Sequence, residues 1–119
     1  MRMVLMALCA SIALSSCSTA RREPGADDIA RAQALRPQDA QLAERYERSC
    51  MACHAVQGSG APLTGFVPQW EERLGKGMDR LVEHAYEGFN AMPVRGLCND
   101  CTKDDMRALI RFMSAGAAA

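Results

Sequence analysis

Cys50-Met51-Ala52-Cys53-His54 is the stretch of sequence that decides the fold of this chain. Two cysteines separated by two residues and followed directly by histidine form the attachment signature of a c-type haem. Each thiol adds to one vinyl group of the porphyrin, so the two sulfurs must lie one turn apart on a short helix. The imidazole of the next residue then reaches the ring, where one of its nitrogens can bind iron. We therefore predict covalent attachment through Cys50 and Cys53, with His54 as the proximal ligand.

A second cysteine pair leaves a rival interpretation open, because a short CxxCH motif is also compatible with zinc or redox chemistry. The chain has six cysteines, and Cys98 and Cys101 form another CxxC pair. Zinc ribbons typically place about 15–20 residues between two such pairs, and far more intervene here. Cys98 and Cys101 also lack the strand-then-helix context of a thioredoxin-like site. A haem-free zinc-binding envelope lipoprotein stays the alternative.

Length and charge limit the possible functions. The chain has 119 residues and a formal net charge of +0. This length predicts one small domain together with any removed or unstructured segment. The balanced charge gives no indication of a basic surface, so we expect no nucleic-acid partner.

The N-terminus predicts export. Residues 1–16 combine a positively charged start with an apolar run that is shorter than the about 20 residues of a membrane-spanning helix. Leu14-Ser15-Ser16-Cys17 is similar to a bacterial lipobox, in which cleavage just before the cysteine accompanies its acylation. Ordinary signal cleavage near Ala20, with loss of Cys17, is the alternative. The pattern favours a periplasmic lipoprotein, anchored to a bacterial membrane by the lipid on Cys17.

Residues 17–38 are expected to be the lipidated cysteine and a flexible tether. This segment holds charged residues, glycine and proline, with no aromatic residue and little to bury. A flexible coil of about twenty residues spans roughly 25 Å on average, enough to lift a small domain off a membrane. Asp27 to Arg36 is compatible with a short helical piece, which Pro37 ends.

Residues 39–116 are predicted to form one all-α domain, because no segment shows sustained two-residue alternation. Apolar residues recur instead at helical spacing, and capping residues mark the helix ends. A first helix is expected to carry Leu42, Tyr46 and Cys50 into the CxxCH motif, followed by a second over 68–74 and a third from about Met78 to Gly88. A last helix is expected to begin at a Thr102–Asp105 capping box. Its buried face is Met106, Leu109, Ile110 and Met113.

A haem held through His54 needs a sixth ligand or an open position. Met92 lies in Gly88-Phe89-Asn90-Ala91-Met92-Pro93, which is predicted to be a loop between the third and fourth helices. It follows His54 at a sequence distance that lets this loop wrap the opposite face of the haem. Other methionines of the domain fit helix faces, where they serve as core residues, or lie too close to His54. We therefore predict Met92 as the distal ligand.

These motifs resemble class I cytochrome c, and within it the short bacterial cytochromes of the c-five type. The likeness extends from about Leu42 to Met113. It is carried by Tyr46 before the CxxCH motif, Gly60-Ala61-Pro62, Trp70 with Arg73, Gly88…Met92-Pro93, and Gly96-Leu97-Cys98-Asn99-Asp100-Cys101. The resemblance implies a small cytochrome c fold, with about four helices around one covalently bound haem c.

The resemblance also implies roles for side chains around the haem. Pro62 would direct its carbonyl at the other imidazole nitrogen of His54, which fixes the tautomer and strengthens the ligand. Trp70 and Arg73 would lie near the haem edge and its propionates. Cys98 would be disulfide-bonded to the second cysteine of its own pair, Cys101.

The chain departs from the family directly after Met92. Where the family often has further proline and lysine, this chain has Val94-Arg95. The charge around the exposed haem edge, and with it the partner, therefore does not follow from the resemblance. Apolar walls that keep water from the haem and tune its potential are expected from Phe66, Trp70, Leu81, Val82, Phe89 and Ile110.

The predicted ligand set determines the expected function. Imidazole and thioether together leave iron no position for a substrate, which predicts outer-sphere, one-electron transfer rather than enzymatic activity. Redox partner proteins, such as a membrane respiratory complex, an oxidase or a dehydrogenase, would bind in weak, short-lived complexes. The alternative is a haem-based ligand sensor, in which Met92 would dissociate easily.

Overall fold

The computed structural model describes residues 22–115. Over this range the chain is helical and contains no strand, apart from an isolated antiparallel bridge between Phe89 and Met92. The α-helices are α1 (Ala26–Ala34), α2 (Ala40–Ser49), α3 (Met51–His54), α4 (Val67–Leu74), α5 (Met78–Glu87) and α6 (Lys103–Ala115), with a short 3-10 helix, η1 (Val94–Leu97), before the last. The predicted all-α class is confirmed.

Three predicted features lie outside the described residues. These are the signal peptide over residues 1–16, the acylation site at Cys17 and the end of the last helix at Gly116. Within residues 22–115, no helix combines the length and the apolar character that crossing a membrane requires.

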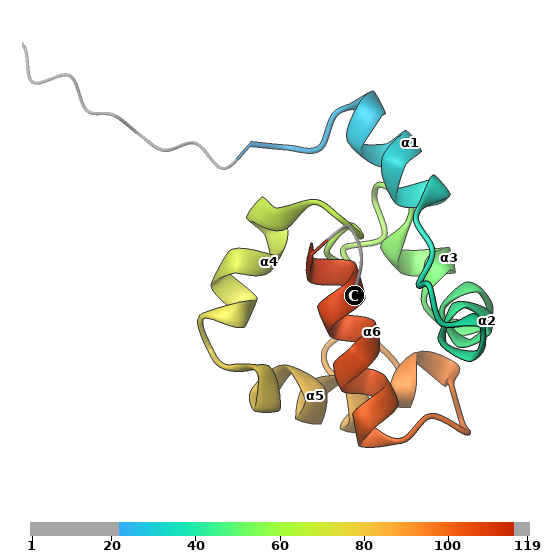
Figure 1. The fold of residues 1–119 in the computed structure, drawn as a ribbon. Coiled ribbons are helices and arrows are strands. Elements are labelled where there is room, and N and C mark those ends of the chain that lie inside the picture. The colour runs from blue at the N-terminus through green and yellow to red at the C-terminus, as the bar shows by residue number, and fades with distance from the viewer. Residues whose placement is uncertain (1–21, 116–119) are drawn as a thin grey trace, which may run out of the picture.

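Helix α6 runs through the middle of the molecule, with α2 and α3 on one side and α4 and α5 on the other (Figure 1). It contacts α2, α4 and α5. The ring of Phe112 on α6 meets the fully buried ring of Tyr46 on α2 edge-on, with their centroids 4.9 Å apart. The core therefore fixes the helix that leads into the CxxCH motif. The buried residues of α6 are Met106, Leu109, Ile110, Phe112, Met113 and Ser114.

Capping side chains mark the start of α2 and, as predicted, the start of α6. At the start of α2, the Leu42 amide donates a 2.8 Å hydrogen bond to the carboxylate of Asp39. At the start of α6, the Thr102 amide donates to the Asp105 carboxylate at 2.9 Å, and the Asp105 amide donates to the Thr102 hydroxyl at 3.2 Å. Helix α4 carries Pro68 in its first turn. The four helices expected from the sequence are confirmed.

The described part of the expected tether, residues 22–38, is not a free coil. Helix α1 packs on the domain through Ala32, which is fully buried in a small cluster with Ala55, Leu63 and Phe66. The segment offers little apolar surface of its own, but these partners from later in the chain supply it. Because alanine is small, the helix can approach them closely.

Charged side chains add to the docking of α1. Arg22 donates two hydrogen bonds to Asp28, at 2.9 and 3.1 Å, and its guanidinium lies 4.7 Å from the centre of the Phe66 ring. Arg36, after the helix, forms an ion pair with Glu47 of α2. The folded unit therefore includes α1 and begins before the boundary predicted at residue 39.

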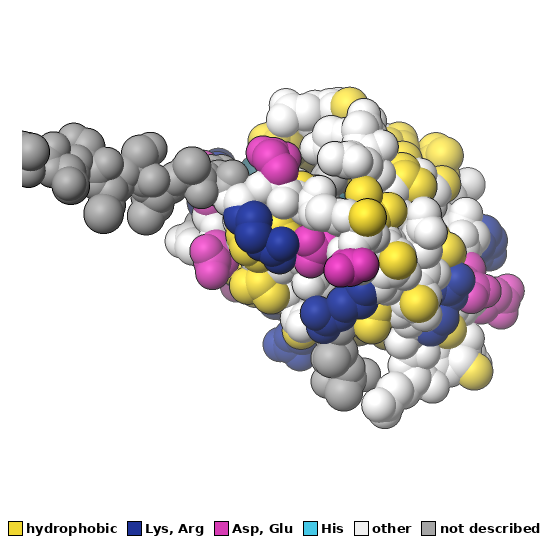
Figure 2. All heavy atoms as spheres, turned by 90° about the horizontal axis from the view of Figure 1, so that it is seen from above, with side chains coloured by type: hydrophobic (Ala, Val, Ile, Leu, Met, Phe, Trp, Pro, Cys, Tyr) yellow, Lys and Arg dark blue, Asp and Glu magenta, His cyan; other side chains and the backbone are white. Residues whose placement is uncertain are grey.

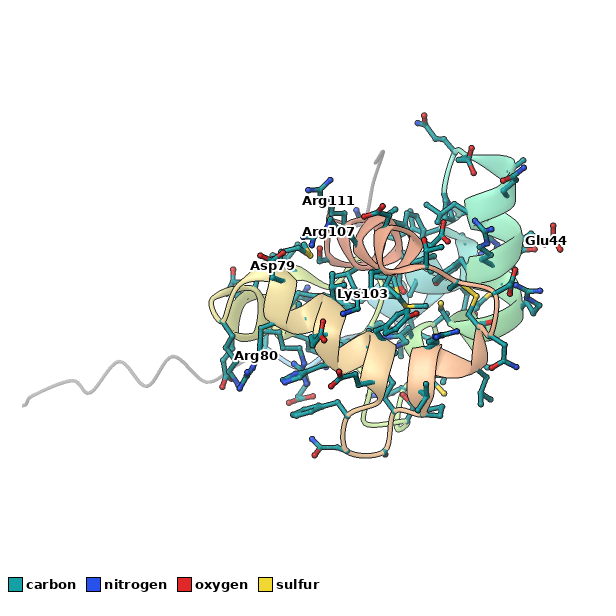
Figure 3. The ribbon with its side chains drawn as sticks, turned by 90° about the horizontal axis from the view of Figure 1, so that it is seen from below. Glu44, Asp79, Arg80, Lys103, Arg107 and Arg111 are labelled. Carbon is teal, nitrogen blue, oxygen red and sulfur yellow. A yellow bond between two sulfur atoms is a disulfide. The ribbon has the colours of Figure 1, made fainter. Side chains whose placement is uncertain are left out.

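Surface charges of both signs are interspersed. The face in Figure 2 shows acidic and basic side chains among hydrophobic ones, without a large field of one sign. At the junction of α5 and α6, Arg107 pairs with Asp79 at 2.6 Å, and Lys103 pairs with Glu83 at 2.7 Å (Figure 3). These pairs are exposed, so each contributes little to stability.

Candidate functional site

The CxxCH motif folds as one helical turn directly after α2. Cys50 lies between α2 and α3, and its carbonyl accepts a 2.9 Å hydrogen bond from the amide of His54. This bond spans the motif from its first residue to its last. The two cysteines and the histidine are therefore held by backbone geometry, as haem attachment requires.

The two thiols of the motif have different surroundings. Cys50 is buried, and this burial, with a smaller contribution from nearby Cys53, raises the pKa of its thiol to about 11. Cys53 is exposed. Neither cysteine forms a disulfide. A group joined to both sulfurs would thus reach from the core to the surface.

His54 is buried with one ring nitrogen occupied. Its Nδ1 donates a hydrogen bond of 2.8 Å to the carbonyl oxygen of Pro62. Burial lowers the pKa of His54, the positive charge of Arg73 adds to this effect, and the bond to Pro62 opposes it. The imidazole is therefore neutral at physiological pH with its proton on Nδ1. Its Nε2 keeps a lone pair, which is the form of histidine that binds metals.

The loop that carries the Pro62 carbonyl is pinned by buried hydrogen bonds. The Tyr46 hydroxyl donates to the Thr64 hydroxyl at 3.0 Å, and the Thr64 amide donates to the His54 carbonyl at 2.7 Å. Trp70 donates from Nε1 to the Leu63 carbonyl at 2.9 Å. Sequence reasoning did not single out Leu63 or Thr64, and no local motif marks either of them. Their role depends on residues far apart in the chain.

Trp70 and Arg73 lie on α4, and both act on His54. The Trp70 ring is buried and nearly parallel to the imidazole of His54, with centroids 5.9 Å apart and 22° between the planes. Arg73 donates to the Gln69 carbonyl, and its charge acts on His54. The structure thus brings both residues to the neighbourhood of the predicted proximal ligand. Their contacts with the haem edge and propionates stay predictions.

The two phenylalanines expected in the haem pocket have different surroundings, and their contacts with the haem stay predictions. Phe66 is buried in the small cluster under α1. Phe89 is 48% exposed and stacks on His84, with ring centroids 4.0 Å apart. Helix α5 ends at Glu87, so Phe89 lies in the loop that follows it. Within residues 22–115, neither ring makes a ring contact with His54.

Met92 lies in the loop between α5 and η1. Its amide donates to the Phe89 carbonyl at 2.9 Å, and its carbonyl accepts from the Phe89 amide at 3.0 Å. The side chain is partly buried against the main hydrophobic cluster, which also contains Cys50 and Trp70. Met92 and the first attachment cysteine therefore border the same core.

A disulfide joins Cys98 to Cys101 just before α6, and the two Cα atoms are 5.3 Å apart. Both cysteines are buried. Between them, Asp100 accepts a 2.7 Å hydrogen bond from Arg48 of α2. The disulfide loop is thus connected to the helix that leads into the CxxCH motif.

The donor set fits a haem better than a bare metal ion. Two free thiols lie one turn apart, a neutral imidazole keeps one free nitrogen, and a thioether borders the same core. Among the described residues, no group of three or more histidine, cysteine or acidic side chains could hold a metal ion. The disulfide also removes Cys98 and Cys101 as zinc ligands.

Known proteins with similar sequences are cytochromes. Residues 37–113 match the family model described as Cytochrome C oxidase, cbb3-type, subunit III. Cytochrome c5 of Ectopseudomonas mendocina is 41% identical over 69 residues, which are 56% of this chain and 79% of the relative. Cytochrome c5 of Azotobacter vinelandii is 39% identical over 67 residues, or 55% of this chain and 81% of the relative.

The fold leads to the same family. The structure is similar to that of one chain in a crystal structure of an electron transfer complex of nitrite reductase with cytochrome c. The TM-score is 0.58 and the sequence identity is 30%. That similarity covers 66% of this chain and 96% of the other. The predicted small cytochrome c fold and the single haem c are confirmed. The chain therefore belongs to the cytochrome c family, as an electron-carrying domain with one covalently bound haem c.

Proposed function

We propose that this cytochrome transfers single electrons between redox partner proteins at a bacterial membrane, with His54 and Met92 as its two axial ligands. The observation that carries the proposal is the arrangement of His54. Its Nδ1 is held by the Pro62 carbonyl at 2.8 Å, which leaves Nε2 free for iron. The bound haem supplies an iron that alternates between the ferric and ferrous states.

The residues around the haem hold its ligands rather than admit a substrate. The Pro62 carbonyl fixes the tautomer and the orientation of the proximal imidazole. The Met92 side chain lies against the main core, in a loop closed by its two hydrogen bonds to Phe89. With His54 and Met92 both bound to it, the iron would offer no position to a substrate. A rigid site of this kind suits electron transfer, because little has to move when the charge changes.

Two features support contact with a redox partner. Cys53 is exposed, so a haem attached there has an edge close to the surface. Phe89, Val94 and Leu97 expose apolar side chains on either side of Met92 in the sequence. Such residues favour the weak, short-lived complexes of electron carriers. The structurally similar chain comes from a complex with nitrite reductase, which supports a redox protein as the kind of partner.

The N-terminal sequence supports attachment to a membrane from the periplasmic side. The lipobox-like Leu14-Ser15-Ser16-Cys17 follows an apolar run typical of export signals. An acylated Cys17 carries several acyl chains, and burial of each methylene contributes about 0.8 kcal/mol to anchoring. The lipid would keep the cytochrome close to membrane-bound donors or acceptors.

Substitution of Met92 tests the proposed ligand set. A thioether bound to ferric haem gives a weak charge-transfer band at the red end of the visible spectrum. We expect Met92→Ala to lose this band and to have a lower reduction potential, because the thioether favours ferrous iron. Met78→Ala is a matched control, since Met78 is also partly buried against the main cluster. It should keep the band. A Met92→Ala protein that retained the band would contradict Met92 as the ligand.

Membrane attachment needs a separate experiment. Replacing residues 1–17 with an ordinary cleavable export signal should release a soluble cytochrome with an unchanged absorption spectrum. The full-length protein should instead fractionate with the membrane and carry acyl chains detectable by mass spectrometry. Full-length protein found wholly in the soluble fraction would exclude the lipid anchor and leave the redox assignment untouched.

A further inference from the structure

The segment that follows Met92 makes a left-handed turn. Arg95, Gly96 and Leu97 have φ angles of 54°, 57° and 68°. Residues with a Cβ atom disfavour this conformation, and two of these three are not glycine. Such a turn persists only where contacts with the surrounding structure hold it in place.

The turn lies against the tip of the Met92 side chain. A Cβ atom added to the buried Gly96 would lie 3.5 Å from Met92 Cε and 3.6 Å from the carbonyl oxygen of Ser49. Ser49 is the last residue of α2, directly before Cys50. Gly96 therefore fills the space between the Met92 side chain and the start of the haem-attachment motif. A shift of this turn would change the position of the thioether.

Arg95 ties the turn to two neighbouring elements. Its Nη2 donates a 2.8 Å hydrogen bond to the hydroxyl of Tyr86 on α5, and its guanidinium carbon lies 4.3 Å from the centre of that ring. Its Nη1 donates to the carbonyl of Asn99 at 2.8 Å. Asn99 belongs to the loop closed by the disulfide. One side chain thus connects the turn to α5 and to the disulfide loop.

The guanidinium is suited to this connection because its fork offers donors in fixed directions. Its Nε is buried without a hydrogen-bond partner among the described residues. An unsatisfied buried donor disfavours the arrangement. The two Nη bonds and the stacking on Tyr86 must therefore outweigh this cost for the turn to persist.

We propose that Arg95 is a positioning residue for Met92. By holding the left-handed turn between Tyr86 and Asn99, it keeps the thioether in place and disfavours its replacement by other ligands. This inference depends on the proposed role of Met92 as the distal ligand.

Imidazole binding to the ferric holoprotein measures how readily Met92 leaves. The apparent affinity for imidazole rises with the fraction of molecules in which the ligand loop is open. We expect Arg95→Gln to bind imidazole about tenfold more tightly than the wild type, which corresponds to about 1.4 kcal/mol. Arg95→Lys keeps the cation near Tyr86 but cannot bridge both acceptors, so its affinity should lie between the two.

Tyr86 and Lys103 supply the comparison variants. Tyr86→Phe removes one hydrogen bond and keeps the ring, so we expect a smaller increase in imidazole affinity. Lys103 also lies over the Tyr86 ring, with Nζ 5.2 Å from its centre, and pairs with Glu83 rather than with the turn. Lys103→Gln should leave the imidazole affinity at its wild-type value. Hydrogen exchange of the amides at residues 92–98 should rise in Arg95→Gln and stay unchanged in Lys103→Gln.

The outcomes separate this inference from the proposed ligand set. If Arg95→Gln and Tyr86→Phe bind imidazole as weakly as the wild type while Met92→Ala binds it tightly, Arg95 does not position Met92. An equal increase in Arg95→Gln and Lys103→Gln would also overturn the inference, because the effect would then not be specific to the turn. If Met92→Ala itself shows no increase, the ligand assignment fails and the inference fails with it.

Discussion

The carbonyl oxygen of Pro62 accepts a 2.8 Å hydrogen bond from Nδ1 of His54. This contact connects the CxxCH helix to the loop that follows it and selects one tautomer of the imidazole. A hydrogen bond of this kind makes the other ring nitrogen more basic, which favours ferric iron. The reduction potential therefore depends on how firmly the loop holds the carbonyl.

Loosening this loop should raise the reduction potential. Pro62→Gly keeps the carbonyl but removes the ring that restricts the backbone. We expect a rise of up to about 60 mV, the shift that a tenfold change in preference produces for one electron. A spectroelectrochemical titration measures it. Pro68→Ala, which changes the proline in the first turn of α4, should leave the potential unchanged. An equal shift in both variants would contradict the role of the Pro62 carbonyl.

The docking of α1 can be tested at one buried alanine. Ala32→Asp places a charge in the cluster with Leu63 and Phe66, and an unpaired buried charge costs about 3–5 kcal/mol. We expect α1 to detach, with faster hydrogen exchange over residues 26–34. Ala30→Asp, at an exposed position of the same helix, is the control. Slow exchange in both variants would mean that Ala32 does not hold α1 in place.

The Cys98–Cys101 disulfide should affect the Met92 loop more than global stability. The bridge closes a very short loop, for which the loop-entropy relation gives only about 2 kcal/mol. Replacing both cysteines with alanine should lower the free energy of unfolding by about that amount in urea titrations. Hydrogen exchange should rise more over residues 92–98 than in α6. Uniform acceleration of exchange throughout the domain would contradict a local role.

The capping box of α6 gives the stability a defined dependence on pH. A backbone hydrogen bond from Thr102 is the main cause that lowers the pKa of Asp105 below its ordinary value of 3.8, with further contributions from the Thr102 hydroxyl and Arg45. Between the lowered pKa of the folded state and the ordinary pKa of 3.8, the unfolded chain therefore binds more protons than the folded chain. The stabilisation is therefore complete above about pH 4 and is lost as the pH falls through the lowered folded pKa.

Asp105→Asn should lower the free energy of unfolding by about 1 kcal/mol at pH 7, the usual contribution of a capping side chain. The difference from the wild type should shrink towards pH 2 in urea titrations. Asp104→Asn, an exposed neighbour in the same turn, should differ little from the wild type at either pH. A difference for Asp105→Asn that did not change with pH would contradict the role of the ionised carboxylate.

Local signals were sufficient to predict the helices that begin or end at capping residues. The Thr102–Asp105 box and Pro68 lie next to the backbone groups that they affect, so α6 and α4 could be predicted from a few neighbouring letters. A short helix near α1 was also expected from Asp27 to Arg36, but its packing on the domain could not be predicted in this way. Its burial depends on Leu63 and Phe66, which lie far along the chain. From its composition alone, the segment was predicted to be a flexible tether.

In the candidate site, too, local structure could be predicted from the sequence and tertiary contacts could not. The spacing of Cys50, Cys53 and His54 predicts one helical turn, because a turn is a local structure. The hydrogen bond between Tyr46 and Thr64 that pins the Pro62 loop is tertiary, and no short motif indicates it. Phe89 was expected among the apolar walls around the haem. Helix α5 ends before it and Gly88 turns the chain with φ 89°, so its ring is exposed.

Exposure of the ferrous wild-type protein to carbon monoxide tests the central claim most directly. If His54 and Met92 both bind the iron, no position is open, and the absorption spectrum should not change on addition of the gas. The Met92→Ala protein, with one position open, should bind carbon monoxide and show a clear spectral shift. Ready binding of carbon monoxide by the wild type would contradict the closed site, and with it the assignment of this cytochrome as an electron carrier rather than a ligand sensor.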